Sequence, residues 1–100
     1  MVKHISIWTL QDKCYGPNLE SIKENIKTTL EGLNGKIPGL QSMIVFTDCL
    51  SSSNGDVALE AVFESEEAVK AYKQNELRLA ATKDAIVPFV DTTRQVEFEI

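Results

Sequence analysis

The sequence predicts an α+β fold in which a four-stranded antiparallel sheet carries helices on one face only. Four segments rich in β-branched and aromatic residues, as expected of strands, lie at residues 2–10, 40–50, 56–64 and 94–100. Amphipathic segments follow the first and the third of them. The order β-α-β-β-α-β is the split βαβ, or ferredoxin-like, arrangement. The chain has 100 residues, which is the size of a single domain spanning 1–100.

The first strand and the first helix follow from clear periodicities. Residues 2–10 read VKHISIWTL, and a period of two separates Ile5 and Ile7 from a second face with His4, Ser6, Trp8 and Leu10. Apolar residues then recur at steps of three and four, as one stripe of a helix, at Leu19, Ile22, Ile26, Leu30 and Leu33. Glycines and the Pro38-Gly39 pair end this helix.

The second and third strands are expected to form a hairpin. The segment SSSNGD separates them, and Asn54-Gly55 favours a turn because both residues tolerate positive φ. The alternation of the third strand is mixed. It places Val57, Leu59, Ala61 and Phe63 on one face, and Val62 shares the other face with Glu60 and Glu64.

The second helix is expected to be broken in two. Ser65 is a suitable N-cap, followed by two glutamates at the positive end of the helix. The pattern turns polar at residues 74–76, resumes from Leu77 to Ile86 and stops at Pro88. The last strand alternates, with Val96, Phe98 and Ile100 expected inward and Gln95, Glu97 and Glu99 expected outward.

A sheet with helices on one face needs a cover for its other face. The first three strands carry apolar residues of both parities, so neither of their faces suits solvent. The simplest cover at this size is a second copy, packed sheet to sheet about a two-fold axis. The sequence therefore predicts a homodimer formed through the open sheet face.

Composition limits the other partners and the compartment. The net charge is −5 and the Lys and Arg residues are scattered, which argues against nucleic-acid binding. No apolar run reaches the ~18 residues of a membrane span, and no secretory signal is apparent. Cys14 and Cys49 are far apart and, with one histidine, give no metal-ligand spacing. We expect a cytoplasmic protein with two reduced thiols, no metal and no cofactor.

Four segments in register resemble the stress-responsive α/β-barrel (Dabb) family. They are MVKHISIWTL at the N-terminus, GLNGKIPGLQS after the first helix, FESEEAVKAY at the start of the second, and the final proline followed by VEFEI. The resemblance covers nearly the whole chain. It implies a dimeric α+β barrel with a cavity between each sheet and its helices. It also implies loosely defined functions, which include stress proteins of unknown activity and a few polyketide cyclases.

The cyclase branch of this family uses a Tyr and a His in a pattern like A-Y-x-x-H-P-x-H, and a strand-one His faces its cavity. Tyr72 and His4 match those positions, whereas the His-Pro-x-His portion is replaced by Asn75-Glu76-Leu77-Arg78. An amide cannot act as a base, and an arginine stays protonated with a pKa above ~12. The replacement argues against cyclase-type proton abstraction. Arg78 would instead suit an anionic ligand.

These residues leave several functions open. His4 is either a hydrogen-bonded core residue or part of a pocket, and Asn75 and Arg78 are either a pocket lip or a solvated helix joint. The favoured function is a homodimer that binds a small apolar or aromatic ligand in the sheet–helix cavity, with the candidate ligand-binding residues His4, Ser6, Trp8, Tyr72, Asn75 and Arg78. The alternative is a polyketide cyclase or lyase, or a cofactor-independent oxygenase, with the catalytic candidates His4 and Tyr72. A third is a structural stress protein whose interior is filled by side chains.

Overall fold

The computed structural model describes residues 1–100 and has the predicted order of elements. The strands are β1 (Val2–Leu10), β2 (Leu40–Phe46), β3 (Val57–Phe63) and β4 (Val90–Glu99). The helices are α1 (Leu19–Glu31), α2 (Glu66–Gln74) and α3 (Glu76–Ala85), and a short 3-10 turn, η1 (Asp12–Cys14), precedes α1. The α+β, ferredoxin-like prediction is confirmed.

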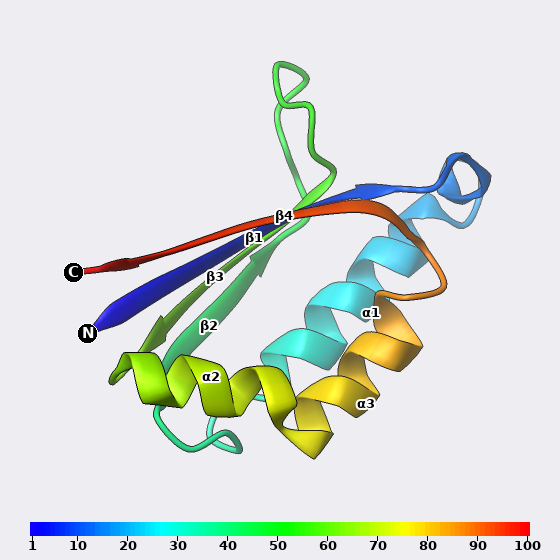
Figure 1. The fold of residues 1–100 in the computed structure, drawn as a ribbon. Helices are drawn as coiled ribbons and strands as arrows, with labels where there is room; N and C mark the ends of the chain where they lie inside the picture. Colours follow the sequence, from blue (N-terminus) through cyan, green and yellow to red (C-terminus); the bar gives the residue numbers. More distant parts are fainter.

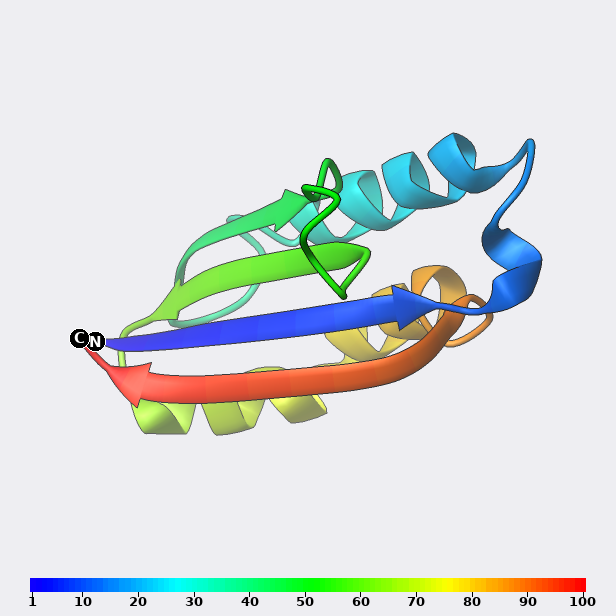
Figure 2. The same cartoon turned by 90° about the horizontal axis from the view of Figure 1, so that it is seen from above.

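The four strands form one antiparallel sheet in the order β2-β3-β1-β4. All three helices lie on the same side of it, and the other side is bare apart from a projecting loop (Figures 1 and 2). The two chain termini meet at one end of the sheet, where β1 and β4 are paired (Figure 2). We call the bare side the open face.

The hydrophobic core lies between the sheet and the helices. Its largest fully buried side chains come from α1 and from the helix-facing positions of the strands, namely Phe63, Ile26, Leu30, Leu59, Val45 and Val57. Each such side chain contributes about 1.5–3 kcal/mol by leaving water. The predicted stripe of α1 and the predicted inner face of β3 both lie in or against this core.

The break in the second helix is a change of direction at Asn75. Ser65 caps α2 as predicted, since its Oγ accepts a hydrogen bond from the Ala68 amide at 3.2 Å. Asn75 has an extended backbone, ends α2 and caps α3. Its Oδ1 accepts the Leu77 amide at 2.8 Å. The polar stretch in the sequence is therefore a capped joint between two helices.

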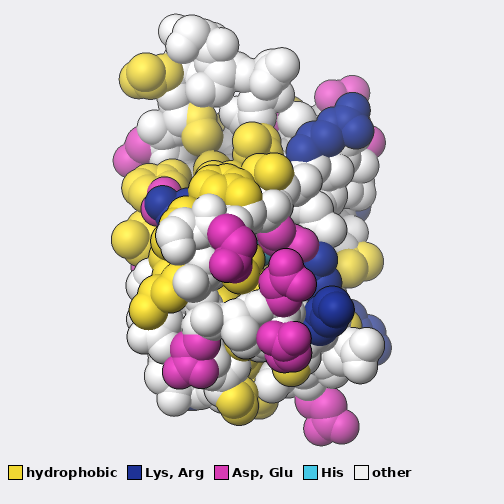
Figure 3. Space-filling model, turned by 60° about the vertical axis from the view of Figure 1, so that its left-hand side comes forward, with side chains coloured by type: hydrophobic (Ala, Val, Ile, Leu, Met, Phe, Trp, Pro, Cys, Tyr) yellow, Lys and Arg dark blue, Asp and Glu magenta, His cyan; other side chains and the backbone are white.

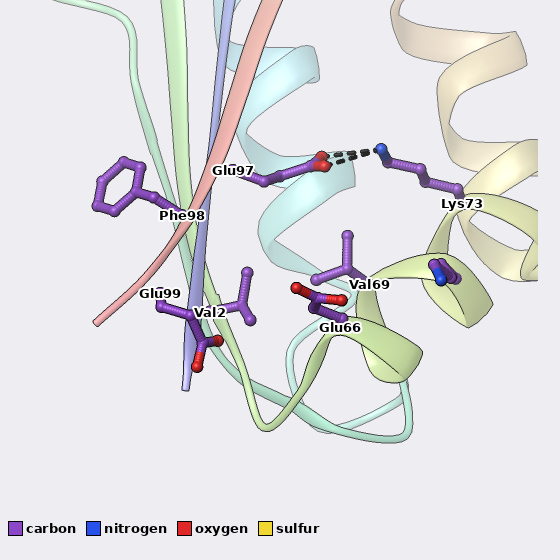
Figure 4. Close-up of a pocket in the computed structure, with 8 residues that line it drawn as sticks. Val2, Glu66, Val69, Lys73, Glu97, Phe98 and Glu99 are labelled. Carbon is purple, nitrogen blue, oxygen red and sulfur yellow. Dashed lines mark hydrogen bonds and ion pairs between the residues drawn. The ribbon is translucent and has the colours of Figure 1, made fainter.

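The orientation predicted for β4 is wrong. The register pairs His4 with Glu97 and Ile5 with Val96, and paired residues share a face. Glu97 therefore points toward the helices, while Val96, Phe98 and Ile100 are exposed. Phe98 points away from α2 in Figure 4. Alternation alone cannot orient an edge strand whose apolar side lies on an uncovered face.

The hairpin turn also differs from the prediction. Strand β2 ends at Phe46, and residues 47–56 form a long loop instead of a tight turn. The only positive-φ residues are Gly35 and Gly39, so Asn54-Gly55 does not adopt the geometry that its sequence favours.

No helix has the length and hydropathy to cross a membrane.

Candidate functional site

His4 lies at the centre of a buried hydrogen-bond chain on the helix-facing side of the sheet. Its side chain is 4% exposed. The Nδ1 atom is 2.6 Å from Glu97 Oε2, and the Nε2 atom is 2.9 Å from Ser6 Oγ. A carboxylate accepts only, so Nδ1 carries the proton of the neutral ring and Nε2 accepts from the Ser6 hydroxyl. Two side chains, Glu97 of β4 and Ser6 of β1, thus set the tautomer of His4.

Glu97 is shared between His4 and a lysine of α2. Lys73 Nζ lies 2.9 Å from Glu97 Oε2 and 3.1 Å from Oε1. The two side chains reach toward each other from β4 and α2 (Figure 4). Burial disfavours the carboxylate, but the hydrogen bonds from Lys73 and His4 outweigh it and lower the pKa of Glu97 below its usual value. The carboxylate is therefore ionised at neutral pH.

The pKa of His4 is lowered below 6.5. Burial is the main cause, because it penalises the imidazolium, and the partial compensation from Glu97 does not cancel it. Lys73 and Arg78 add a smaller repulsion of positive charge. At neutral pH the ring is an uncharged base whose acceptor atom is turned toward Ser6.

An aromatic cluster packs beside His4. Tyr72 is 3% exposed, and its ring centroid lies 5.0 Å from that of Phe63 and 6.1 Å from that of His4. The guanidinium carbon of Arg78 lies 5.3 Å from the Tyr72 centroid, a cation–π contact. Burial raises the pKa of Tyr72, and the nearby Arg78 only partly opposes this. The phenol stays protonated and is available as a hydrogen-bond donor.

Arg78 has one buried polar atom without a partner. Its Nη1 donates to the Lys73 carbonyl at 3.3 Å, whereas its buried Nε makes no hydrogen bond. A buried donor without an acceptor is costly, so an acceptor supplied by a ligand would be favourable there. Asn75, by contrast, already uses its carbonyl oxygen to cap α3.

The predicted site residues are partly gathered and partly separated. His4, Ser6, Tyr72 and Arg78 form one region beneath the joint of α2 and α3. Trp8 is buried but stands opposite Val57 and Thr93. That position is four residues from His4, which is about 13 Å along a strand. Trp8 therefore belongs to the other end of the core.

A pocket of about 320 Å³ lies beside this region, between α2 and β4. Val2 and Val69 point toward each other inside it, and the Lys73–Glu97 pair closes its inner end (Figure 4). His4, Tyr72 and Arg78 do not line it. The interior at His4 is packed, and Glu97 connects it to this opening. No group of three or more His, Cys, Asp or Glu side chains is placed to hold a metal.

Sequence reasoning missed Glu97 and Lys73. No signal in the sequence alone identifies Glu97, because only the register of β1 with β4, which opposes His4 and Glu97, places the two residues on one face. Lys73 is one residue after Tyr72 and faces the sheet edge rather than solvent alone. The observed orientation of β4 turns Glu97 toward the helices, where it contacts both His4 and Lys73.

Solved structures with the same fold span the whole chain. A dimeric ferredoxin-like protein of unknown function from Bacteroides fragilis has a TM-score of 0.89 at 23% identity, covering 99% of this chain and 95% of that one. A dimeric ferredoxin-like protein from Thermobifida fusca has a TM-score of 0.82 at 26% identity, with 99% and 90% covered. SnoaB, a cofactor-independent oxygenase from Streptomyces nogalater, has a TM-score of 0.70 at 13% identity, with 99% and 91% covered. A search of curated proteins found no match.

The fold and the buried polar cluster define a ferredoxin-like α+β domain with one covered and one open sheet face. The sequence matches the stress responsive A/B Barrel Domain (Dabb) family over residues 2–100. The chain belongs to this family.

Proposed function

We propose that this chain is a cytoplasmic homodimeric Dabb domain that binds a small aromatic or apolar ligand between its sheet and its helices. The ligand would enter at the pocket between α2 and β4 and reach the cluster of His4 and Tyr72. One observation carries this proposal. Glu97 joins the buried His4 to Lys73 at the inner end of the pocket, so a moderate shift of the ion pair would link the pocket to the interior.

The homodimer is supported by the chemistry of the open face. Its exposed large apolar side chains come from three strands and the C-terminus, namely Ile7, Ile44, Phe46, Val96, Phe98 and Ile100. Hydrophobic side chains gather beneath the projecting loop in Figure 3. A contiguous apolar patch of this kind is typical of an interface. Two structures of the same fold are described as dimeric.

The character of the ligand follows from the groups around the pocket. Val2 and Val69 offer apolar contact, and the rings of Tyr72 and Phe63 lie further inside. The lining also holds Glu66, Glu97 and Glu99 beside Lys70 and Lys73. An acceptor such as a carboxylate is therefore favoured only at Lys73 and, deeper in the interior, at the unpartnered Nε of Arg78. An aromatic ring with one acidic group combines both requirements.

Native mass spectrometry and NMR together test this binding. We expect a co-purified small molecule on the dimer, or saturable shifts of the His4 ring signals when 2-naphthoate is added. Lys73→Met should weaken the 2-naphthoate effect, because it removes the cation at the pocket's inner end. Lys36→Met, which replaces an exposed lysine after α1, should leave it unchanged. Finding neither a bound molecule nor a shift would remove the ligand-binding proposal.

A second candidate is an enzyme that uses His4 as a base and Tyr72 as a hydrogen-bond donor. It is favoured by the Glu97–His4–Ser6 chain, in which a neutral imidazole is held by a carboxylate. Rotation of the Ser6 hydroxyl would free Nε2 for a substrate proton. His4→Ala should abolish any turnover found with aromatic or polyketide-like substrates, and unchanged turnover would eliminate this candidate.

A further inference from the structure

The long loop between β2 and β3 projects from the sheet on its open face. We call residues 47–56 the arm. We propose that the arm packs against a second copy of the chain, with Leu50 as the apolar group that it places on the partner. This inference rests on the proposed homodimer and adds a second element to its interface.

The root of the arm is fixed to the rest of the domain. The Asp56 amide donates to the Trp8 carbonyl at 2.8 Å, and Asp56 Oδ2 accepts the Leu10 amide at 2.8 Å. The same carboxylate accepts the Tyr15 hydroxyl, and this contact raises the pKa of Tyr15 to about 12. These bonds fix the C-terminal root of the arm at Asp56, which reduces the ordering that a contact with a partner requires.

The arm leaves the sheet directly over the open face. A Cβ added to Gly55 would lie 2.5 Å from Ile7 Cγ2, so the backbone passes close against an open-face side chain. In Figure 1 the arm rises on the side opposite the helices, and in Figure 2 it stands in front of the strands. A second copy seated on this face must therefore meet the arm.

The arm carries the most exposed large apolar side chain of the protein. Leu50 is 76% exposed. At the root, Ile7 and Ala58 of the open face and Cys49 and Gly55 of the arm border a recess of about 290 Å³. The recess and the apolar side chains of the open face are continuous through Ile7, which belongs to both. A second copy is the occupant that covers the face and the arm together.

The test compares two aspartate substitutions at exposed aliphatic positions. Leu50→Asp should raise the dimer dissociation constant, measured by sedimentation equilibrium, at least about tenfold, as for a central apolar contact. Val87→Asp alters a side chain that is 67% exposed, in the connection after α3 on the helix side of the sheet. It should leave the constant within about twofold of wild type.

A label on the arm gives an independent readout. Cys49 is exposed and Cys14 is buried, so an environment-sensitive fluorophore can be attached to Cys49 alone. Its emission should shift to shorter wavelength as the protein is concentrated through the dimer transition. Equal dissociation constants for the two aspartate variants, with no emission shift, would overturn the arm contact while leaving the homodimer intact. A wild-type protein that stays monomeric would instead remove the homodimer itself.

Discussion

Glu97 connects the buried His4 to helix α2. It holds the Nδ1 proton of His4 and pairs with Lys73, so one carboxylate fixes a strand-one tautomer and ties α2 to the edge strand. A chain of this kind is worth more than an exposed ion pair, because two of its bonds lie in a region of reduced dielectric. The position of His4 and Ser6 on one strand face could be predicted from period two, whereas the partner of His4 required the register of β4.

His4 is the only histidine, so its titration can be followed by NMR without ambiguity. We expect a pKa below 6.5, because burial penalises the charged ring more than Glu97 stabilises it. Glu97→Gln should lower this pKa further, since a carboxylate favours the imidazolium and an amide does not. Glu99→Gln, an exposed position on the same strand face, is the matched control. A His4 pKa at or above 6.5 in the wild type would contradict the burial argument.

The lowered pKa values of His4 and Glu97 also make the free energy of unfolding depend on pH. The folded-state pKa of His4 lies below its unfolded value of 6.5, so the unfolded chain binds this proton more readily. The free energy of unfolding should fall as the pH drops from above 6.5 through the folded-state pKa. Glu97, whose pKa is lowered from 4.5, adds a second loss below pH 4.5. Urea denaturation at a series of pH values measures both, and stability that is flat between pH 7 and 4 would disagree.

Asn75 acts as a helix cap. Its Oδ1 accepts the amides of Leu77 at 2.8 Å and Arg78 at 3.4 Å. Asn75→Ala should reduce the free energy of unfolding by about 1 kcal/mol, whereas Asn75→Asp should retain the cap. Gln74→Ala, at the exposed neighbouring position, should be close to neutral. If Asn75→Ala were as stable as Gln74→Ala, the side chain would not be capping α3.

At the scale of the elements, side chains from the helical layer cover part of the outer edge of β2. The outer edge of β2 is sealed at Val45, whose amide is bound by Glu31 Oε2 at 2.8 Å and whose carbonyl is bound by Lys27 Nζ at 2.7 Å. Asn34 Nδ2 also binds the Met43 carbonyl at 2.9 Å. Side chains from α1 and the turn after it therefore occupy backbone groups that would otherwise pair with another strand. These contacts oppose the pairing of a second copy along this part of β2.

Glu31→Ala tests this seal. Burial disfavours its carboxylate, but the Val45 amide and Lys27 outweigh that and lower the pKa of Glu31. Its removal leaves the Val45 amide without its partner, and we expect a loss of about 1–3 kcal/mol in the free energy of unfolding. Glu24→Ala, an exposed position on the same helix, should cost less than about 0.5 kcal/mol. Chemical denaturation of the two variants side by side measures the difference, and equal losses would refute the seal.

Elements were predicted better than their orientations. Periodicity located α1, and the cap at Ser65 and the polar break at residues 74–76 located α2 and α3. The sequence does not predict which side of β4 points toward the helices, because the register with β1 decides on which face of the sheet its apolar side lies. The arm could not be predicted either, since Asn54-Gly55 suggests a tight turn that the longer connection does not need.

At the scale of the whole molecule, the sheet is apolar on both sides but only one side is covered within the chain. The helices bury the side that carries Phe63, Leu59 and Val57. The open face keeps its apolar residues in water, with a single Lys3–Glu60 ion pair at 3.1 Å among them. That pair is already satisfied within the chain, whereas Arg94, which opposes Ile7 on the same face, forms no ion pair and needs an acceptor from a second copy or a place at the rim of the interface. The chain therefore forms a complete domain, but one face of its sheet still exposes apolar side chains to water.

Sedimentation equilibrium of the wild type beside Val96→Asp tests the homodimer most directly. Val96 is 52% exposed at the centre of β4 on the open face, so an aspartate there should fold normally within the monomer but oppose sheet-to-sheet packing. We expect the wild type at micromolar concentration to have twice the mass of one chain, and Val96→Asp to have the mass of one chain with an unchanged circular dichroism spectrum. A wild-type protein that is monomeric at that concentration, or a Val96→Asp variant that dimerises as tightly as the wild type, would contradict association through the open face.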